Sequence, residues 1–117
     1  MKTCEEISPD DISSLRRWIR ELDITYSRIL KGSLLLTFRE LLRLIEDFID
    51  VVIEGKISTK QIFKQYIRIQ TQILDFSNKA IEGFNTLDVE HIRRGLSKVL
   101  LVLLTWHIQQ QVLKELM

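Results

Sequence analysis

The side chains with the most recognisable chemistry in this 117-residue chain are one cysteine and two histidines, Cys4, His91 and His107. Asp88 and His91 are three residues apart, so on a helix they would place two metal ligands on one face. Metal sites in helical bundles need more, namely glutamates on facing helices together with Glu-x-x-His pairs. Neither histidine has that spacing. We therefore interpret His91 as a solvated residue near a helix start and His107 as a packed residue beside an apolar face.

Known catalytic motifs are also missing from the sequence. It has no Gly-x-Ser-x-Gly turn, no phosphate-binding loop and no His-Glu-x-x-His zinc motif, and no base neighbours the thiol of Cys4. We expect no catalytic residue, no metal, no cofactor and no small-molecule substrate. The protein is therefore not expected to be an enzyme.

Cysteine usage and apolar runs bear on the location of the protein. A single cysteine cannot form an intrachain disulfide, which fits a reducing compartment. Residues 1–6 lack the apolar segment of a signal peptide. The apolar run 99–108 is shorter than the roughly 20 residues that cross a bilayer. We expect a cytoplasmic protein without membrane contact.

Arginines near an aromatic side chain raise the possibility of nucleic-acid binding. The candidates are Arg16, Arg17, Arg20, Arg39, Arg43, Arg93 and Arg94. Arginine grips phosphates and an aromatic ring stacks on bases, and Trp18 lies among the first three arginines. The alternative places Trp18 at the core boundary and leaves the arginines solvated. A formal net charge of +1 gives no global attraction to nucleic acid, so we keep this function as an alternative.

A second basic row has a simpler explanation. Its members recur every four residues: Lys56, Lys60, Lys64 and Arg68. Acids precede them at the end of the previous predicted helix: Glu46, Asp47, Asp50 and Glu54. In an antiparallel helix pair these acids would lie beside the basic row, so we expect interhelical ion pairs. Exposed pairs add only about 0–1 kcal/mol each, so their role would be to set register.

Apolar residues at alternating spacings of three and four predict four helices, over residues 9–31, 33–54, 58–82 and 87–116. Helix signals agree with these limits. Ser8 can cap the first helix, and Gly32 and Gly55 can end the first two. Ser58 with Gln61 forms a capping-box pattern, and Asn85 or Thr86 can cap the last helix. No alternating run indicates a strand.

Four helices joined by short connections predict an all-α, single-domain fold. We expect an antiparallel up-down-up-down four-helix bundle that dimerises through its C-terminal helix. One rival is a more open array in which the last helix pairs across a dimer. Another is exchange of a helical hairpin between chains, if the joint at Gly32 and Ser33 straightens.

The last predicted helix is the feature around which this interpretation is built. No charged residue occurs between Val99 and Leu113. The side opposite its core stripe changes from polar to apolar, with the later members Leu101, Leu104, Ile108 and Val112. A helix that is apolar all round is normally covered all round. Gly95 in this helix costs about 1 kcal/mol relative to alanine and indicates a close helix contact.

These patterns favour a non-enzymatic protein–protein interaction module of unknown pathway. We predict a homodimer whose interface contains Leu101, Leu104, Ile108 and Val112. One alternative is a small nucleic-acid-associated subunit that contacts the phosphate backbone through a basic end of the bundle. Another is a chaperone-like protein that binds a partner's amphipathic helix, with the same surface as one groove wall.

Overall fold

The computed structural model describes residues 11–116, which form a short 3-10 helix and four α-helices. The elements are η1 (Ile12–Ser14), α1 (Leu15–Tyr26), α2 (Gly32–Glu54), α3 (Thr59–Ile81) and α4 (Thr86–Leu116). Within the described residues there is no strand. The predicted all-α class with four helices is confirmed.

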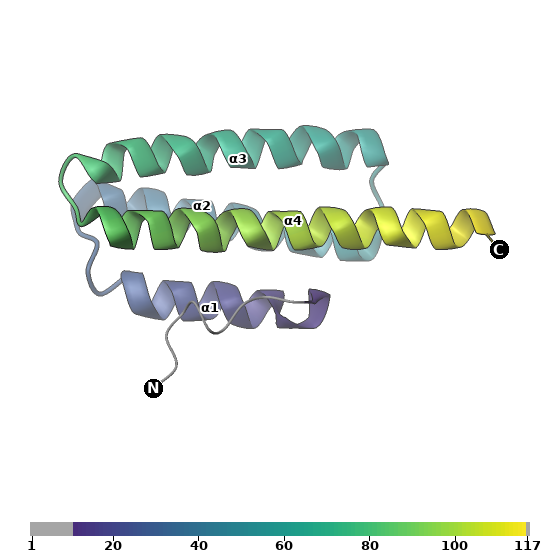
Figure 1. The fold of residues 1–117 in the computed structure, drawn as a ribbon, viewed down its shortest axis with the longest axis horizontal. Helices are drawn as coiled ribbons and strands as arrows, with labels where there is room; N and C mark the ends of the chain where they lie inside the picture. The colour runs from purple at the N-terminus through teal and green to yellow at the C-terminus, as the bar shows by residue number, and fades with distance from the viewer. Residues whose placement is uncertain (1–10, 117) are drawn as a thin grey trace.

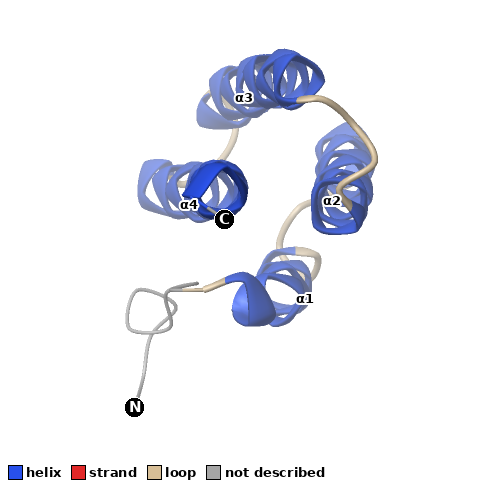
Figure 2. Ribbon diagram, turned by 90° about the vertical axis from the view of Figure 1, so that its right-hand side faces the viewer, coloured by secondary structure: helices blue, strands red, loops and turns tan. Residues whose placement is uncertain are grey.

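The four α-helices lie alongside one another and enclose a common core. In Figure 1 the colour progression reverses from each helix to the next along the long axis. Figure 2, which looks along the helices, shows α4 and α2 on opposite sides of the bundle, each lying between α3 and α1. The core therefore receives one face from every helix.

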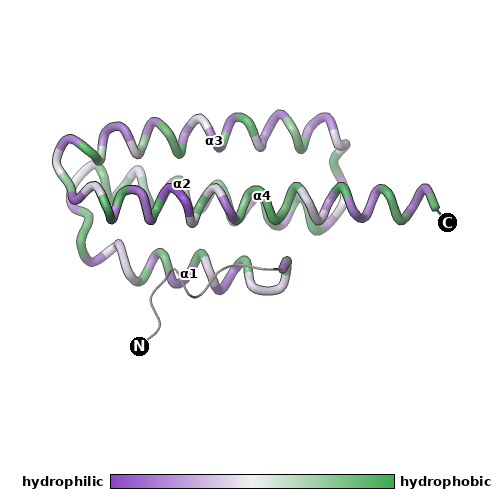
Figure 3. The backbone as a smooth tube through the Cα atoms, viewed as in Figure 1, coloured by the Kyte–Doolittle hydropathy of each residue, from purple (hydrophilic) through white to green (hydrophobic). Residues whose placement is uncertain are grey.

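Spacings of three and four residues place the apolar side chains in this core. Green and purple alternate along every helix in Figure 3, as expected for helices with one buried face. Phe38 of α2 and Phe76 of α3 are completely or almost completely buried, and their ring centroids are 5.8 Å apart. Ile45, Ile69 and Leu96 extend the core along α2, α3 and α4.

Local signals fix the limits of α2, α3 and α4. Gly55 follows α2 with a φ of 69°, the left-handed conformation that glycine adopts without strain. The Ser58 hydroxyl accepts a hydrogen bond from the Gln61 N–H at 3.2 Å, so the predicted cap of α3 is formed. At the start of α4, Asn85 Oδ1 accepts from the Leu87 N–H at 2.8 Å.

The first helix differs from its predicted range. Asp11 caps η1 by accepting hydrogen bonds from the N–H groups of Ser13 and Ser14, whereas the predicted cap Ser8 lies outside the described residues. Helix α1 ends at Tyr26, and residues 27–31 form a turn. Gly32, with a φ of 62°, begins α2 and does not end the first helix.

Candidate interaction surface on α4

Helix α4 is longer than the helices beside it. It has 31 residues, whereas α2 and α3 have 23 each. Thr59 Oγ1 is 2.9 Å from His107 Nε2, which sets residue 107 level with the first residue of α3. Residues 108–116 therefore continue past the start of α3, and Figure 1 shows this end of α4 projecting from the bundle.

The inward side of α4 includes one residue predicted to lie on the outside. Val99, Leu100 and Leu103 are fully buried, and Leu104 is only 9% exposed. Leu104 lies about 60° around the helix from Leu101, because each residue turns the helix by about 100°. The buried face of α4 is wide enough to include it, since α4 packs between α3 and α1. The prediction of Leu104 as an interface residue is wrong for this reason.

The outward side of α4 keeps the other three predicted residues. Leu101, Ile108 and Val112 are between 42 and 53% exposed, and we call them the α4 outer row. Leu113 is also about half exposed, because it lies beyond the start of α3 where no helix covers it. Trp106 is half-buried. A long apolar surface therefore follows α4 to its end.

Two hollows border the α4 outer row. The first measures about 310 Å³ and is lined by Asp11, Ile12, Lys98, Leu101, Val102, Thr105, Trp106 and Gln109. The second measures about 370 Å³ and is lined by Ile108, Gln109, Gln110, Val112 and Leu113. Both have apolar walls with polar groups at the rim, which is the surface character of a protein-contact site.

His107 lies on the buried side of α4, as predicted. It is 4% exposed, and its Nε2 is hydrogen-bonded to Thr59 at the start of α3. Burial, and to a smaller extent the charge of Lys114, lowers the pKa of His107 below its usual value of 6.5. His107 therefore acts as a neutral polar link between α3 and α4.

This histidine makes a pH-dependent contribution to stability. The unfolded chain binds a proton at His107 more readily than the folded chain does, so the contribution is complete above about pH 6.5. It is lost as the pH falls from about 6.5 through the lower folded-state pKa. We expect urea unfolding to give a smaller free energy at pH 5.5 than at pH 7.5, and a smaller difference for His107→Gln. Equal pH dependence in both proteins would contradict this assignment.

His91 is half-buried, so its predicted solvated position is wrong. Its ring centroid is 6.5 Å from that of Tyr26 of α1, and its Nε2 is shielded without a hydrogen-bond partner. The first turns of α4 are covered by the end of α1, a contact that the local sequence does not encode. Among residues 11–116 no three His, Cys, Asp or Glu side chains gather closely enough to hold a metal ion.

The seven candidate arginines are distributed over three helices. Arg16, Arg17 and Arg20 lie on α1, Arg39 and Arg43 on α2, and Arg93 and Arg94 on α4. Arg16 pairs with Asp50 of α2. Arg93 Nη2 lies 2.7 Å from Glu90 Oε2, and its hydrogen bonds lower the pKa of the Glu90 carboxyl. Arg94 Nε lies 3.6 Å from the same oxygen.

Trp18 lies inside the bundle. It is 5% exposed, and its Nε1 donates a hydrogen bond to the Gly95 carbonyl oxygen at 3.1 Å. A Cβ added to Gly95 would be 3.2 Å from Trp18 Cζ2, so the predicted close helix contact at Gly95 is confirmed. The indole ring is engaged in this contact and is not exposed to stack on a base.

The basic row on α3 does not form the predicted series of ion pairs. Lys56 Nζ is 3.7 Å from Glu54 Oε2. Within the described part of the chain, no carboxylate lies within ion-pair distance of Lys60, Lys64 or Arg68. Asp50, one of their expected partners, pairs with α1 instead. These three side chains are exposed on the outer side of α3.

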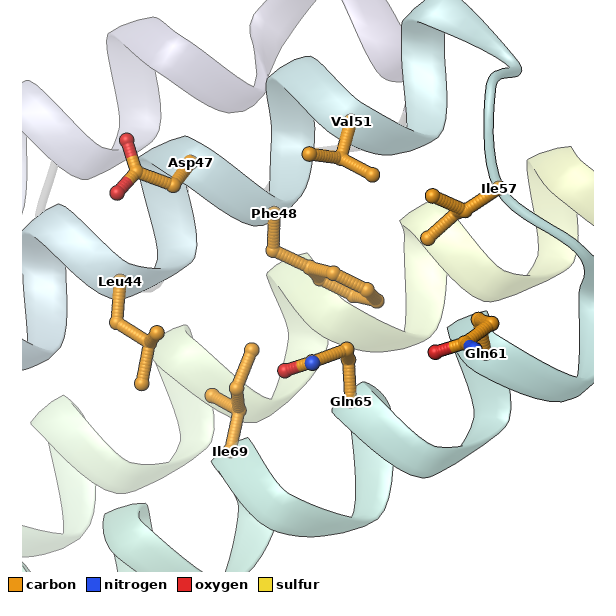
Figure 4. Close-up of a pocket in the computed structure, with 8 residues that line it drawn as sticks. All are labelled: Leu44, Asp47, Phe48, Val51, Ile57, Gln61, Gln65 and Ile69. Atoms are coloured by element: carbon orange, nitrogen blue, oxygen red, sulfur yellow. The ribbon is translucent and has the colours of Figure 1, made fainter.

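A further hollow of about 300 Å³ lies between α2 and α3 (Figure 4). Its lining comprises Leu44, Asp47, Phe48, Val51, Ile57, Gln61, Gln65 and Ile69. Phe48 and Ile69 are buried core residues, whereas Asp47 and Gln61 are exposed at the rim. This shallow apolar hollow could accommodate a side chain of a partner.

No known protein-family model matches the chain, and no curated protein or solved structure is significantly similar to it. Among the described residues, none of the helices has an apolar stretch long enough to cross a membrane.

Proposed function

We propose that this chain is a non-enzymatic protein–protein interaction module, an antiparallel four-helix bundle that forms a homodimer through the α4 outer row. One observation carries the proposal. Leu101, Ile108 and Val112 are exposed on a single side of a helix that continues past the start of α3. Large apolar side chains in a contiguous exposed row are typical of contact sites between proteins.

A second copy fits this row in the antiparallel direction. Arg94, Leu101, Ile108 and Glu115 are spaced seven residues apart, which places them along the same side of α4. A two-fold axis between residues 104 and 105 would set Leu101 opposite Ile108 of the second copy. The same axis would set Arg94 opposite Glu115. Apolar side chains would meet in the middle, and opposite charges would meet at both ends.

The proposal is tested with Leu101→Glu. Glutamate in the centre of a closed apolar contact would have to lose its hydration without a partner, so the dimer should dissociate. At the lowest measurable protein concentration we expect wild type to have twice the 13.9 kDa chain mass and the variant to have the chain mass itself. Circular dichroism should show unchanged helix content.

Leu87→Glu is the matched control. Leu87 is also exposed, in the first turn of α4, but lies outside the α4 outer row. This control should remain a dimer, because an acid near a helix N-terminus is well tolerated. A folded Leu101→Glu protein that stays dimeric at the same low concentration would rule out this interface.

The hollow between η1 and α4 favours a second candidate, a chaperone-like binder of an amphipathic helix. Its volume of about 310 Å³ can take large apolar side chains of a partner helix, with Ile12 and Trp106 among its walls. This function requires a monomer that leaves the hollow open. Titration with an amphipathic peptide should then change the fluorescence of half-buried Trp106, and Leu101→Glu should remove that change.

A further inference from the structure

The outer side of α3 carries a second exposed apolar row. Phe63, Ile67, Leu74 and Ile81 are between 40 and 63% exposed. Their spacings of four, seven and seven residues place them within about 40° of one another around the helix. We call them the α3 outer row. The buried residues of α3, such as Ile69 and Phe76, lie on the other side, so the bundle itself does not cover this row.

The charges beside this row change sign along the helix, with Lys79 as the one exception. Lys60, Lys64 and Arg68 flank its first half, whereas Asp75 and Glu82 flank the second half. At about 100° per residue, these five fall on the same flank of the row, as does Lys79. All five are exposed, and none forms an ion pair within the described part of the chain. Thr71, also exposed, lies at the midpoint between the two halves.

We infer that the α3 outer row binds the same row of a second copy, with the two helices antiparallel about a two-fold axis at Thr71. This axis sets Ile67 within one residue of Leu74 of the second copy, and Phe63 within two residues of Ile81. In an antiparallel pair each flank faces the same flank of its partner. Lys60 therefore meets Glu82 of the second copy.

Arg68 comes within one residue of Asp75 of the second copy in the same register. A parallel pair would place the charged flanks of the two copies on opposite sides of the contact, so Arg68 would not meet Asp75 of the second copy. An anionic membrane would attract the first half of the row but would also meet Asp75 and Glu82. An antiparallel second copy pairs Lys60 with Glu82 and Arg68 with Asp75, and Lys79 beside Lys64 is the one like-charge contact.

This contact is distinct from the proposed α4 interface. Ser97 Oγ donates to Gln70 Oε1 at 3.0 Å, and His107 is level with Thr59, so residues 104 and 105 of α4 lie level with about residue 62 of α3. The two-fold axes are then separated along the bundle by about nine residues, roughly 14 Å. Two axes that do not meet generate an open chain of molecules and not a closed tetramer. Dimers formed through α4 would therefore join through α3 as concentration rises.

Cross-linking on the proposed axis distinguishes the two contacts. The full chain carries Cys4→Ser, which removes its only native thiol, and a single new cysteine for a short bis-maleimide cross-linker. Thr71→Cys reports the α3 contact and Thr105→Cys the α4 contact. Leu36→Cys, exposed on α2 outside both rows, measures random collision.

We expect Thr71→Cys to cross-link into a covalent dimer far more than Leu36→Cys. Adding Ile67→Glu should abolish this product, whereas adding Leu101→Glu should leave it. The α3 contact is overturned if Thr71→Cys cross-links no more than Leu36→Cys. A failure of the α4 proposal has a different signature, since Thr105→Cys would then give no product while Thr71→Cys still does.

A charge exchange provides a second test that does not remove any apolar side chain. Arg68→Glu alone should weaken association of the Leu101→Glu protein about tenfold, because two favourable pairs become repulsive. Adding Asp75→Arg should restore it, since the opposite charges then meet again with the positions reversed. Weakening by both substitutions together would overturn the antiparallel pairing.

Discussion

Gly95→Leu is expected to lower the free energy of unfolding by about 3 kcal/mol. Even a Cβ at this position would lie 3.2 Å from Trp18 Cζ2 and 3.3 Å from Leu22 Cδ1, so a leucine side chain must displace α1. Displacement also breaks the hydrogen bond from Trp18 Nε1 to the Gly95 carbonyl and leaves a buried donor unpaired. Urea unfolding followed by circular dichroism, at fixed protein concentration, measures the change.

Gly83→Leu is the control for this substitution. A Cβ at Gly83 would meet no atom within 4 Å, and its φ is not positive. Its unfolding free energy should therefore change by less than about 1 kcal/mol. Equal effects at Gly95 and Gly83 would show that α1 does not pack closely on α4, and the account of Trp18 as a core residue would be wrong.

Phe76→Ala is expected to destabilise the protein by about 3–5 kcal/mol, the usual effect of removing a buried aromatic ring. Phe76 is 1% exposed and packs against Phe38 at the centre of the bundle. Phe63→Ala provides a matched comparison on the same helix, because Phe63 is 40% exposed. At a concentration too low for α3 association, it should change the unfolding free energy by about 1 kcal/mol or less.

Thermal or urea unfolding of both phenylalanine variants compares the inward and outward sides of α3 directly. If Phe63→Ala costs as much as Phe76→Ala, the outer side of α3 is covered within the molecule. The α3 outer row would then be part of the core, and no second copy could bind there.

Helix positions could be predicted from the sequence where local physics decides them. Two residues between α2 and α3 fix the limits of these helices. Gly55 ends α2 by its positive φ, and Ser58 caps α3 with its hydroxyl. The sequence predicts a longer first helix than α1, because the apolar spacing continues through Ile29 and Leu30. Leu30 is indeed buried, but it reaches the core from a turn.

The orientation of α4 could be predicted only in part. Between Val99 and Leu113 there is no charged side chain to mark the outward side, so Leu101 and Leu104 look alike in the sequence. The packing of α1 and α3 decides that Leu104 is inside and Leu101 outside. The same limit applies to Arg16 and Asp50, which are 34 residues apart and meet only because α1 lies against α2.

The sequence predicts internal ion pairs for the basic row on α3, because the end of the preceding helix is acidic. The three-dimensional arrangement instead leaves Lys60, Lys64 and Arg68 exposed beside the α3 outer row. The sequence alone shows that Ile67 and Ile81 are each seven residues from Leu74. That spacing identifies a shared side of the helix, but only the packed bundle shows that this side faces outward.

Light scattering behind a sizing column, with absorbance at 260 and 280 nm, tests the central claim most directly. At the lowest measurable concentration the wild-type chain is predicted to have twice the mass of the 13.9 kDa chain, with an absorbance ratio typical of protein alone. A species of the chain mass would contradict the homodimer through α4 and favour binding of a partner helix. Co-eluting nucleic acid would contradict the account and would favour nucleic-acid binding through the exposed arginines.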